Sequence, residues 1–261
     1  MRLVPSARFP VIAPILAAFV LFTYLMPAHA ERRNYLLLEL DGHKVKWGEN
    51  RFGTPASVSY AFAEETMHFD DAINCRELAP IEGLVGERLS REQLTHETAV
   101  AFRVWERAAG LSFHKVNDPR DADIVIGTQG RPRGRAFANV SYKTDAEHEV
   151  RTIRQALVCL NPTQMWKVGF DGDEDVYDIQ YTLVHEIGHA IGLDHPGPSG
   201  QVMAFRYTEA FNDLQSGDLL GVQQLYGPPN AGSASAETFP GTGQSGIVGA
   251  KVPENVLSIN D

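Results

Sequence analysis

The spacing of three histidines constrains this chain more than any other feature of its sequence. His185 and His189 are four residues apart in an apolar stretch, and His195 follows six residues later. On an α-helix, residues four apart stand one above the other, so both imidazoles can reach one metal ion. Gly192 lies between the second and third histidines, where a glycine can end a helix and turn the chain back. The third imidazole can then join the first two.

Three neutral imidazoles are typical of a catalytic zinc ion, because they leave the fourth tetrahedral position to water. Glu186 follows His185 directly, so its side chain flanks the open position and does not fill it. A carboxylate there can take a proton from zinc-bound water, which then attacks a peptide carbonyl. The sequence therefore predicts one catalytic Zn²⁺ held by His185, His189 and His195, with Glu186 as the general base.

The other candidate ligands do not suggest a second site of this kind. Neither Cys75 nor Cys159 has another cysteine or a histidine at zinc-ligand spacing. In an oxidising compartment the two would form a disulfide, and the alternative is a pair of buried free thiols. Five further histidines have no partner at ligand spacing and are expected to be ordinary surface or core residues: His43, His68, His96, His114 and His148.

The first 30 residues have the pattern of an export signal. Two arginines precede an apolar run over residues 11–26, and Ala-His-Ala at 28–30 supplies a small-x-small cleavage site. We predict that residues 1–30 are a cleaved signal peptide. An uncleaved membrane anchor is the alternative, but the run is shorter than the roughly 20 residues that a spanning helix needs.

Charge limits the partners of the mature chain. Removing residues 1–30 takes away 2 of the 23 basic residues and none of the 33 acidic ones, which changes the net charge from −10 to −12. This charge disfavours nucleic acid and anionic membrane surfaces as partners. With the export signal, we expect a secreted chain, extracellular or periplasmic, that is a monomer and has no stable membrane insertion after signal cleavage. Residues 228–261 are rich in Gly, Ser, Pro and Ala, which predicts a flexible tail.

Residues 31–227 are predicted to form one α+β domain. Ser90 and Gln93 form a capping box at the start of a helix over residues 91–109. Asp178 is a good N-cap for a second helix with a stripe of isoleucine and leucine, and a third helix is predicted over 217–225. Strands are predicted over residues 58–62, 111–116, 123–128, 136–142 and 155–160. This order favours a mixed sheet with helices packed on it.

The histidine motif, followed by Met203 eight residues after His195, resembles the metzincin metallopeptidases. The details are most similar to the matrixins, the matrix metalloproteinase family. Weaker matches occur in the same order as in that family, at residues 99–105, 122–127 and 218–227. The resemblance covers about residues 46–227. The predicted domain begins soon after the signal peptide. The chain therefore resembles a short form of the family without an obvious pro-domain.

The resemblance implies a fold, an activity and several residue roles. The fold would be a twisted mixed sheet of five strands with three helices, whose edge strand at 136–140 pairs with extended substrate. The activity would be that of a secreted zinc-dependent endopeptidase acting on protein or peptide substrates, for which the extracellular matrix is a typical setting. Met203 would lie beneath the zinc, and Tyr207 would help wall an apolar pocket for the side chain after the cleaved bond. Arg135 stands where a histidine ligand of a second, structural zinc would fall, so one zinc ion is expected.

The sequence is also compatible with two other functions and with one further ion. A catalytically idle secreted binding module would keep the fold, but such relatives normally lose the acid or a ligand, and all four residues are present here. A zinc hydrolase of a non-peptide bond is also compatible with the ligand set. The acidic segment 171–178 could bind Ca²⁺, although it lacks the register of an EF-hand, and we favour a solvated acidic loop.

Overall fold

A computed structural model describes residues 34–144, 148 and 150–229 of the chain. The predicted signal peptide and nearly all of the predicted tail lie outside the described residues. No helix among the described residues is long and apolar enough to cross a membrane.

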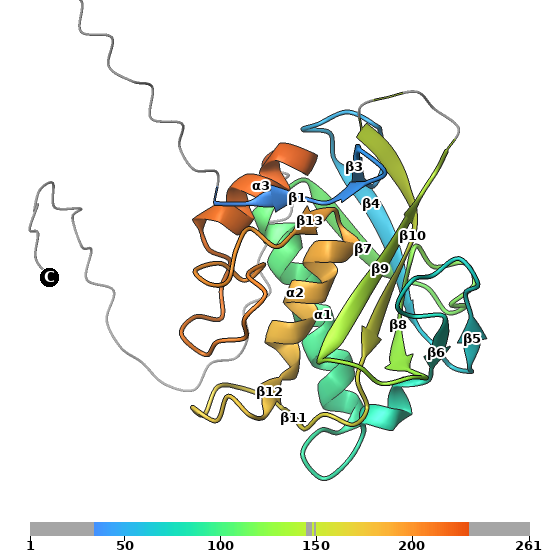
Figure 1. The fold of residues 1–261 in the computed structure, drawn as a ribbon, viewed down its shortest axis with the longest axis vertical. Coiled ribbons are helices and arrows are strands. Elements are labelled where there is room, and N and C mark those ends of the chain that lie inside the picture. The colour runs from blue at the N-terminus through green and yellow to red at the C-terminus, as the bar shows by residue number, and fades with distance from the viewer. Residues whose placement is uncertain (1–33, 145–147, 149, 230–261) are drawn as a thin grey trace, which may run out of the picture. The chain divides into compact units, whose positions relative to one another are not determined.

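The centre of the fold is a mixed sheet of five strands, as predicted (Figure 1). These strands are β4 (Ala56–Phe62), β7 (Leu111–Lys115), β8 (Ile124–Gln129), β9 (Ala136–Tyr142) and β10 (Val150–Leu160). Their order is β7-β4-β8-β10-β9, and all neighbours are parallel except β9, which is antiparallel to β10. Every residue of β8 is buried, as expected for a parallel strand covered on both faces.

Four short strands that the sequence analysis did not predict extend this sheet to nine strands among the described residues. β3 runs parallel to the start of β10, and β6 runs antiparallel to β8. Their bounds are β2 (Glu39–Leu40), β3 (His43–Lys46), β5 (Met67–His68) and β6 (Glu77–Ala79), and a 3₁₀ helix, η1 (Ile81–Leu84), follows β6. Two to four residues are too few to show a periodic pattern in a sequence.

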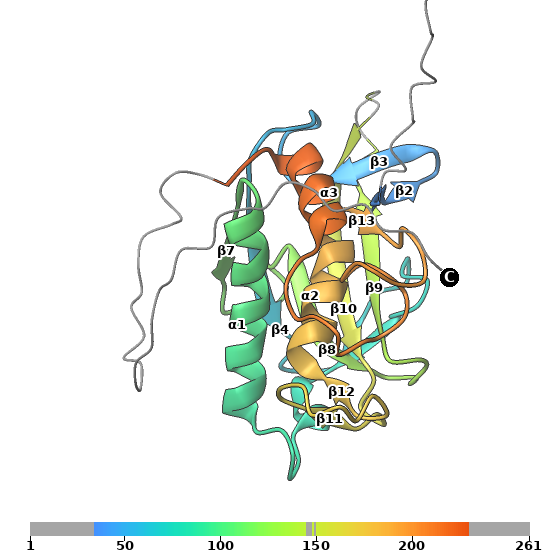
Figure 2. The same ribbon diagram turned by 90° about the vertical axis from the view of Figure 1, so that its left-hand side faces the viewer.

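Three α-helices cover one face of the sheet (Figure 2): α1 (Arg91–Ala108), α2 (Ile179–Ala190) and α3 (Ser216–Tyr226). α1 and α3 agree with their predicted ranges to within one residue at either end, and α2 begins directly after its predicted N-cap, Asp178. Ser90 and Gln93 form the predicted capping box, and the Asp178 carboxylate accepts a hydrogen bond from the backbone N–H of Tyr181. Trp105 of α1 donates from its indole N–H to the carbonyl of Val184, which joins α1 to α2.

The end of α2 is fixed by contacts from distant parts of the chain. Trp47 donates its indole N–H to the carbonyl of Ala190, and the Tyr226 hydroxyl donates to that of Ile191, which satisfies two carbonyls at the helix end. Gly192 then adopts φ +102°, and a Cβ at this position would lie 2.2 Å from the carbonyl oxygen of Val45. Only glycine therefore fits the turn that the sequence predicted here.

Two further pairs of short strands lie outside the main sheet. β1 (Leu36–Leu37) pairs antiparallel with β13 (Leu193–Asp194), directly after the Gly192 turn. β11 (Trp166–Lys167) runs parallel to β12 (Tyr177–Asp178), just before α2. Both pairs flank the helix that carries the first two histidines.

Cys75 and Cys159 form a disulfide, which resolves the alternative left open by the sequence. Cys159 lies on β10, and Cys75 lies in the loop between β5 and β6. Both are almost fully buried. The bridge ties this loop to the centre of the sheet.

Loss of the disulfide is expected to lower the free energy of unfolding by about 2–5 kcal/mol, because the bridge closes a long loop in the unfolded chain. The two cysteines are 84 residues apart in the sequence. Denaturant unfolding of the double variant Cys75→Ala/Cys159→Ala would measure the loss. Adding a reductant should destabilise the parent chain and leave the double variant unchanged; equal stability of the two chains would contradict the expectation.

Candidate metal and catalytic site

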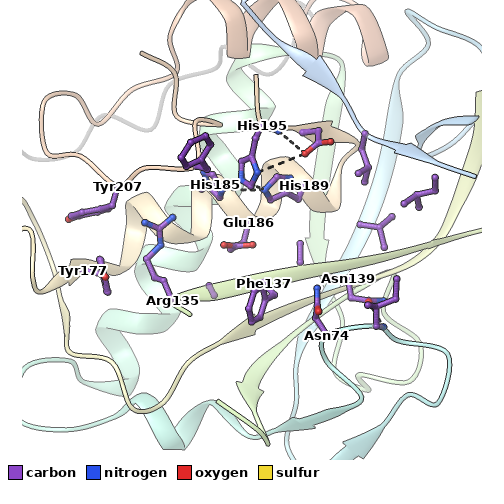
Figure 3. Close-up of a pocket in the computed structure, with 18 residues that line it drawn as sticks. Asn74, Arg135, Phe137, Asn139, Tyr177, His185, Glu186, His189, His195 and Tyr207 are labelled. Carbon is purple, nitrogen blue, oxygen red and sulfur yellow. Dashed lines mark hydrogen bonds and ion pairs between the residues drawn. The ribbon is translucent and has the colours of Figure 1, made fainter. Parts of the chain in front are cut away.

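The fold brings the three predicted histidines together at the C-terminal end of α2. His185 and His189 project from one face of the helix, and His195 returns to them after the Gly192 turn (Figure 3). Their Nε2 atoms lie 3.0, 3.1 and 3.2 Å from one another. Three nitrogens at ~2.0–2.1 Å from one tetrahedral ion would be about 3.4 Å apart. Among the described residues, this is the only group of side chains arranged to hold a metal ion.

Backbone carbonyls orient two of the three rings. His185 Nδ1 lies 2.7 Å from the carbonyl oxygen of Val202, and His189 Nδ1 lies 2.9 Å from that of Leu193. A carbonyl oxygen can only accept a hydrogen bond, so each Nδ1 carries the proton and donates it. Each Nε2 then presents its lone pair to the centre of the cluster, as metal ligation requires.

Burial also keeps the imidazoles neutral. It lowers the pKa of His185 well below its ordinary value and that of His189 to about 4. Burial likewise lowers the pKa of His195, although the neighbouring Asp194 raises it in part. Neutral imidazoles are the form that binds a metal ion.

Glu186 lies between α2 and the edge strand β9, next to the histidine cluster (Figure 3). The side chain is buried, and burial raises the pKa of its carboxyl group to about 7. The charge of Arg135 and a hydrogen bond from the backbone N–H of Ala138 lower this pKa in part. Glu186 is therefore a buried carboxyl group held beside the cluster by the strand that borders it.

Met203 packs against the helix that carries the histidines. A Cβ on Gly188 would lie 2.2 Å from its sulfur and 2.9 Å from Cζ2 of Trp105, so only glycine leaves room for both side chains. The turn that holds Met203 is fixed by the buried carboxylate of Asp218 on α3. This carboxylate accepts hydrogen bonds from the backbone N–H groups of Val202 and Met203 at 2.8 and 3.1 Å.

A cavity of about 570 Å³ opens in front of the histidines. Residues Ala136–Val140 of β9 form one side of it, and β9 pairs only with β10 among the described strands, so its other edge faces the cavity. Leu38 and Leu40, near the start of the described chain, also line the cavity. This segment contributes although the family resemblance begins after it.

One end of the cavity is aromatic and carries a positive charge (Figure 3). Tyr207, Tyr177 and Arg135 line it. The guanidinium carbon of Arg135 lies 5.5 Å from the ring centres of both tyrosines. This end of the cavity therefore has a charged residue in its wall. In the sequence, Arg135 stood out only as a replacement for a histidine, and no spacing pattern marked it as part of the cavity.

The acidic segment 171–178 contacts a lysine ammonium. Lys167 Nζ donates to Asp171 and to the carbonyl of Asp173, and it pairs with Glu209 at 2.6 Å. Asp178 caps α2 and accepts a hydrogen bond from the N–H of Gly169. Lys167 thus supplies the loop with a positive charge, and a loop without calcium remains our expectation.

The fold and the histidine cluster define an α+β metal-site domain of the metzincin type, and comparison with known proteins gives the family. The sequence pattern of the matrixins matches residues 82–227, more than half of the chain. The chain therefore belongs to the matrixin family, whose members are zinc metalloendopeptidases.

Individual relatives agree with this assignment. The chain is 29% identical over 146 residues to the probable matrix metalloproteinase 095L of Invertebrate iridescent virus 3, an alignment covering 55% of this chain and 40% of that protein. It is 31% identical over 150 residues to matrix metalloproteinase-16 of Rattus norvegicus, an alignment covering 50% of this chain and 23% of that protein. It is 29% identical over 154 residues to stromelysin-3 of Homo sapiens, an alignment covering 54% of this chain and 29% of that protein. The chain thus spans less than half the length of these relatives.

Replacing Gly188 by alanine is expected to destabilise the protein by about 1–3 kcal/mol, because the added methyl group overlaps Met203 and Trp105 in a packed core. Helix propensity alone would favour alanine by about 1 kcal/mol. Thermal unfolding measures the net effect. Gly197→Ala is the matched control, since no atom lies within 4 Å of a Cβ built there; a stabilised Gly188→Ala variant would contradict the packing described here.

Proposed function

We propose that this protein is a secreted zinc-dependent endopeptidase in which His185, His189 and His195 hold one catalytic zinc ion and Glu186 is the general base. The observation that carries the proposal is the convergence of three neutral imidazole nitrogens beside a buried carboxyl group, in a cavity bordered by an unpaired strand edge. Membership in the matrixin family supports the same activity.

The residues present fit a zinc ion. Three Nε2 atoms about 3 Å apart, each presented by a neutral ring, form a donor set of the kind and spacing that zinc takes. Their hydrogen bonds to the backbone hold two of the rings before any ion arrives. When bound, zinc would polarise a peptide carbonyl and acidify water.

The protein's own residues would perform the remaining tasks. The free edge of β9 would pair with the extended backbone of a substrate and hold the scissile bond in front of the histidines. The Glu186 carboxylate would take a proton from the attacking water and deliver it to the leaving amine. Burial raises the pKa of this carboxyl group, which makes it a stronger base than an exposed carboxylate.

The cavity also bears on the alternatives. An idle binding module needs neither neutral, oriented imidazoles nor a buried acid beside them, and the chain has both. A hydrolase acting on a non-peptide bond would not need an open strand edge along the site, whereas a peptide substrate does. We therefore favour protein or peptide substrates, and we keep secretion, a monomeric state and a tail beyond residue 227 as parts of the proposal.

Replacing His195 by alanine is expected to lower zinc content from one ion per chain to a small fraction of that, because two imidazoles hold zinc far more weakly than three. Elemental analysis after dialysis measures the metal. His114→Ala is the matched control, since His114 is exposed on β7. Full zinc occupancy in His195→Ala would remove this residue from the ligand set.

Replacing Glu186 by glutamine is expected to lower the rate of peptide cleavage by about 10²–10⁴-fold, the usual contribution of a general base. Zinc content should stay at one ion per chain, because Glu186 is not a ligand. Cleavage of a casein or gelatin substrate measures the rate, with the exposed Glu87→Gln as the matched control. Unchanged cleavage by Glu186→Gln would defeat the proposed role.

A further inference from the structure

Arg135 places a positive charge in the cavity, and the described structure gives it no counter-ion. Its guanidinium forms no ion pair with a carboxylate of the described residues. Its Nε atom is buried without a hydrogen-bond partner. Because Arg135 also lines the cavity, an acceptor group of a ligand there would meet a guanidinium that has no carboxylate partner.

Carboxylates in the same neighbourhood are engaged elsewhere. Glu209 accepts hydrogen bonds from the Tyr207 hydroxyl and from two backbone N–H groups, and it pairs with Lys167. Asp178 caps α2. Glu186 faces the histidine cluster, and although the charge of Arg135 lowers its pKa in part, the two side chains form no ion pair. None of the three forms an ion pair with Arg135.

The surrounding aromatic residues hold the guanidinium in place. Tyr177 and Tyr207 both lie against it, and the two rings pack edge-on with centres 5.2 Å apart. The hydroxyl of Tyr207 is itself fixed, because it accepts a hydrogen bond from the N–H of Asp178 and donates one to Glu209. Tyr181 packs edge-on against Tyr207, and its buried hydroxyl also lacks a partner among the described atoms. The Nε atom of Arg135 and the hydroxyl of Tyr181 are therefore two hydrogen-bond donors without acceptors in one cluster of packed side chains.

We propose that Arg135 makes this enzyme selective for a substrate with a carboxylate just after the cleaved bond. The proposal rests on the proposed endopeptidase activity, and the position follows from Tyr207, whose matrixin counterpart walls the pocket for that side chain. Arginine binds a carboxylate through two parallel hydrogen bonds, which suits a planar group entering between two rings. The carboxylate can be the side chain of an acidic residue or the free C-terminus of a short peptide.

Fluorogenic peptides that share one cleavable bond would test this selectivity. One series carries Glu, Gln, Leu or Lys directly after the bond, and a second series ends shortly after it with either a free carboxylate or an amide. For the unaltered chain, kcat/KM should be about 10–100-fold higher for Glu than for Gln, the range expected for hydrogen bonds between charged groups. If the terminal carboxylate is the ligand, the same ratio should appear in the second series.

Arg135→Met should abolish this preference and still cleave the Gln and Leu peptides, and Arg135→Glu should favour the Lys peptide. Arg131→Met is the matched control, because Arg131 is an exposed arginine outside the cavity. Zinc content and melting temperature show whether each variant is folded. An unaltered chain that cleaves without acid preference, or a preference that survives Arg135→Met, would overturn the inference. A chain that cleaves no peptide at all would overturn the proposed function instead.

Discussion

The site depends on two hydrogen bonds from imidazole N–H groups to backbone carbonyls. An imidazole free to rotate and to choose its tautomer would present Nδ1 or Nε2 to the cavity. The carbonyls of Val202 and Leu193 remove that choice for His185 and His189, because each can accept only from a protonated Nδ1. Burial disfavours the doubly protonated form of both rings. The two hydrogen bonds thus fix the orientation and the tautomer of both rings, and burial keeps the rings neutral.

These two carbonyls are in turn positioned by segments far from the helix in sequence. Asp218 of α3 holds the turn at Val202, and the N-terminus of α3 is held by the side-chain oxygen of Gln201. Leu193 belongs to β13, which pairs with β1 at the start of the described chain. The histidine motif therefore supplies the ligands, whereas α3 and the first strand supply their orientation.

The sequence predicted those parts of the fold that repeat along the chain or use strong local signals. Capping residues marked the starts of α1 and α2, and the buried stripe of α2 followed from its apolar spacing. The Gly192 turn followed from the absence of a Cβ. β1 and β13 were missed because two residues carry no period, and their pairing joins positions more than 150 residues apart. The place of Arg135 in the cavity was not predicted, because it depends on Tyr177 and Tyr207, which only the folded chain brings to it.

The disulfide connects the stability of the sheet to the shape of the cavity. Cys159 stands opposite Phe137 in the register of β10 and β9, and Phe137 lines the cavity. The loop that Cys75 anchors also contacts β9 directly, because the N–H of Ile73 donates to the side-chain oxygen of Asn139. Ile73 and Asn74 of this loop line the cavity, and Asn74 lies at the end opposite Arg135 (Figure 3). An open edge strand is normally a liability for aggregation. Here the disulfide-anchored loop covers one end of that edge and leaves open the stretch that faces Glu186.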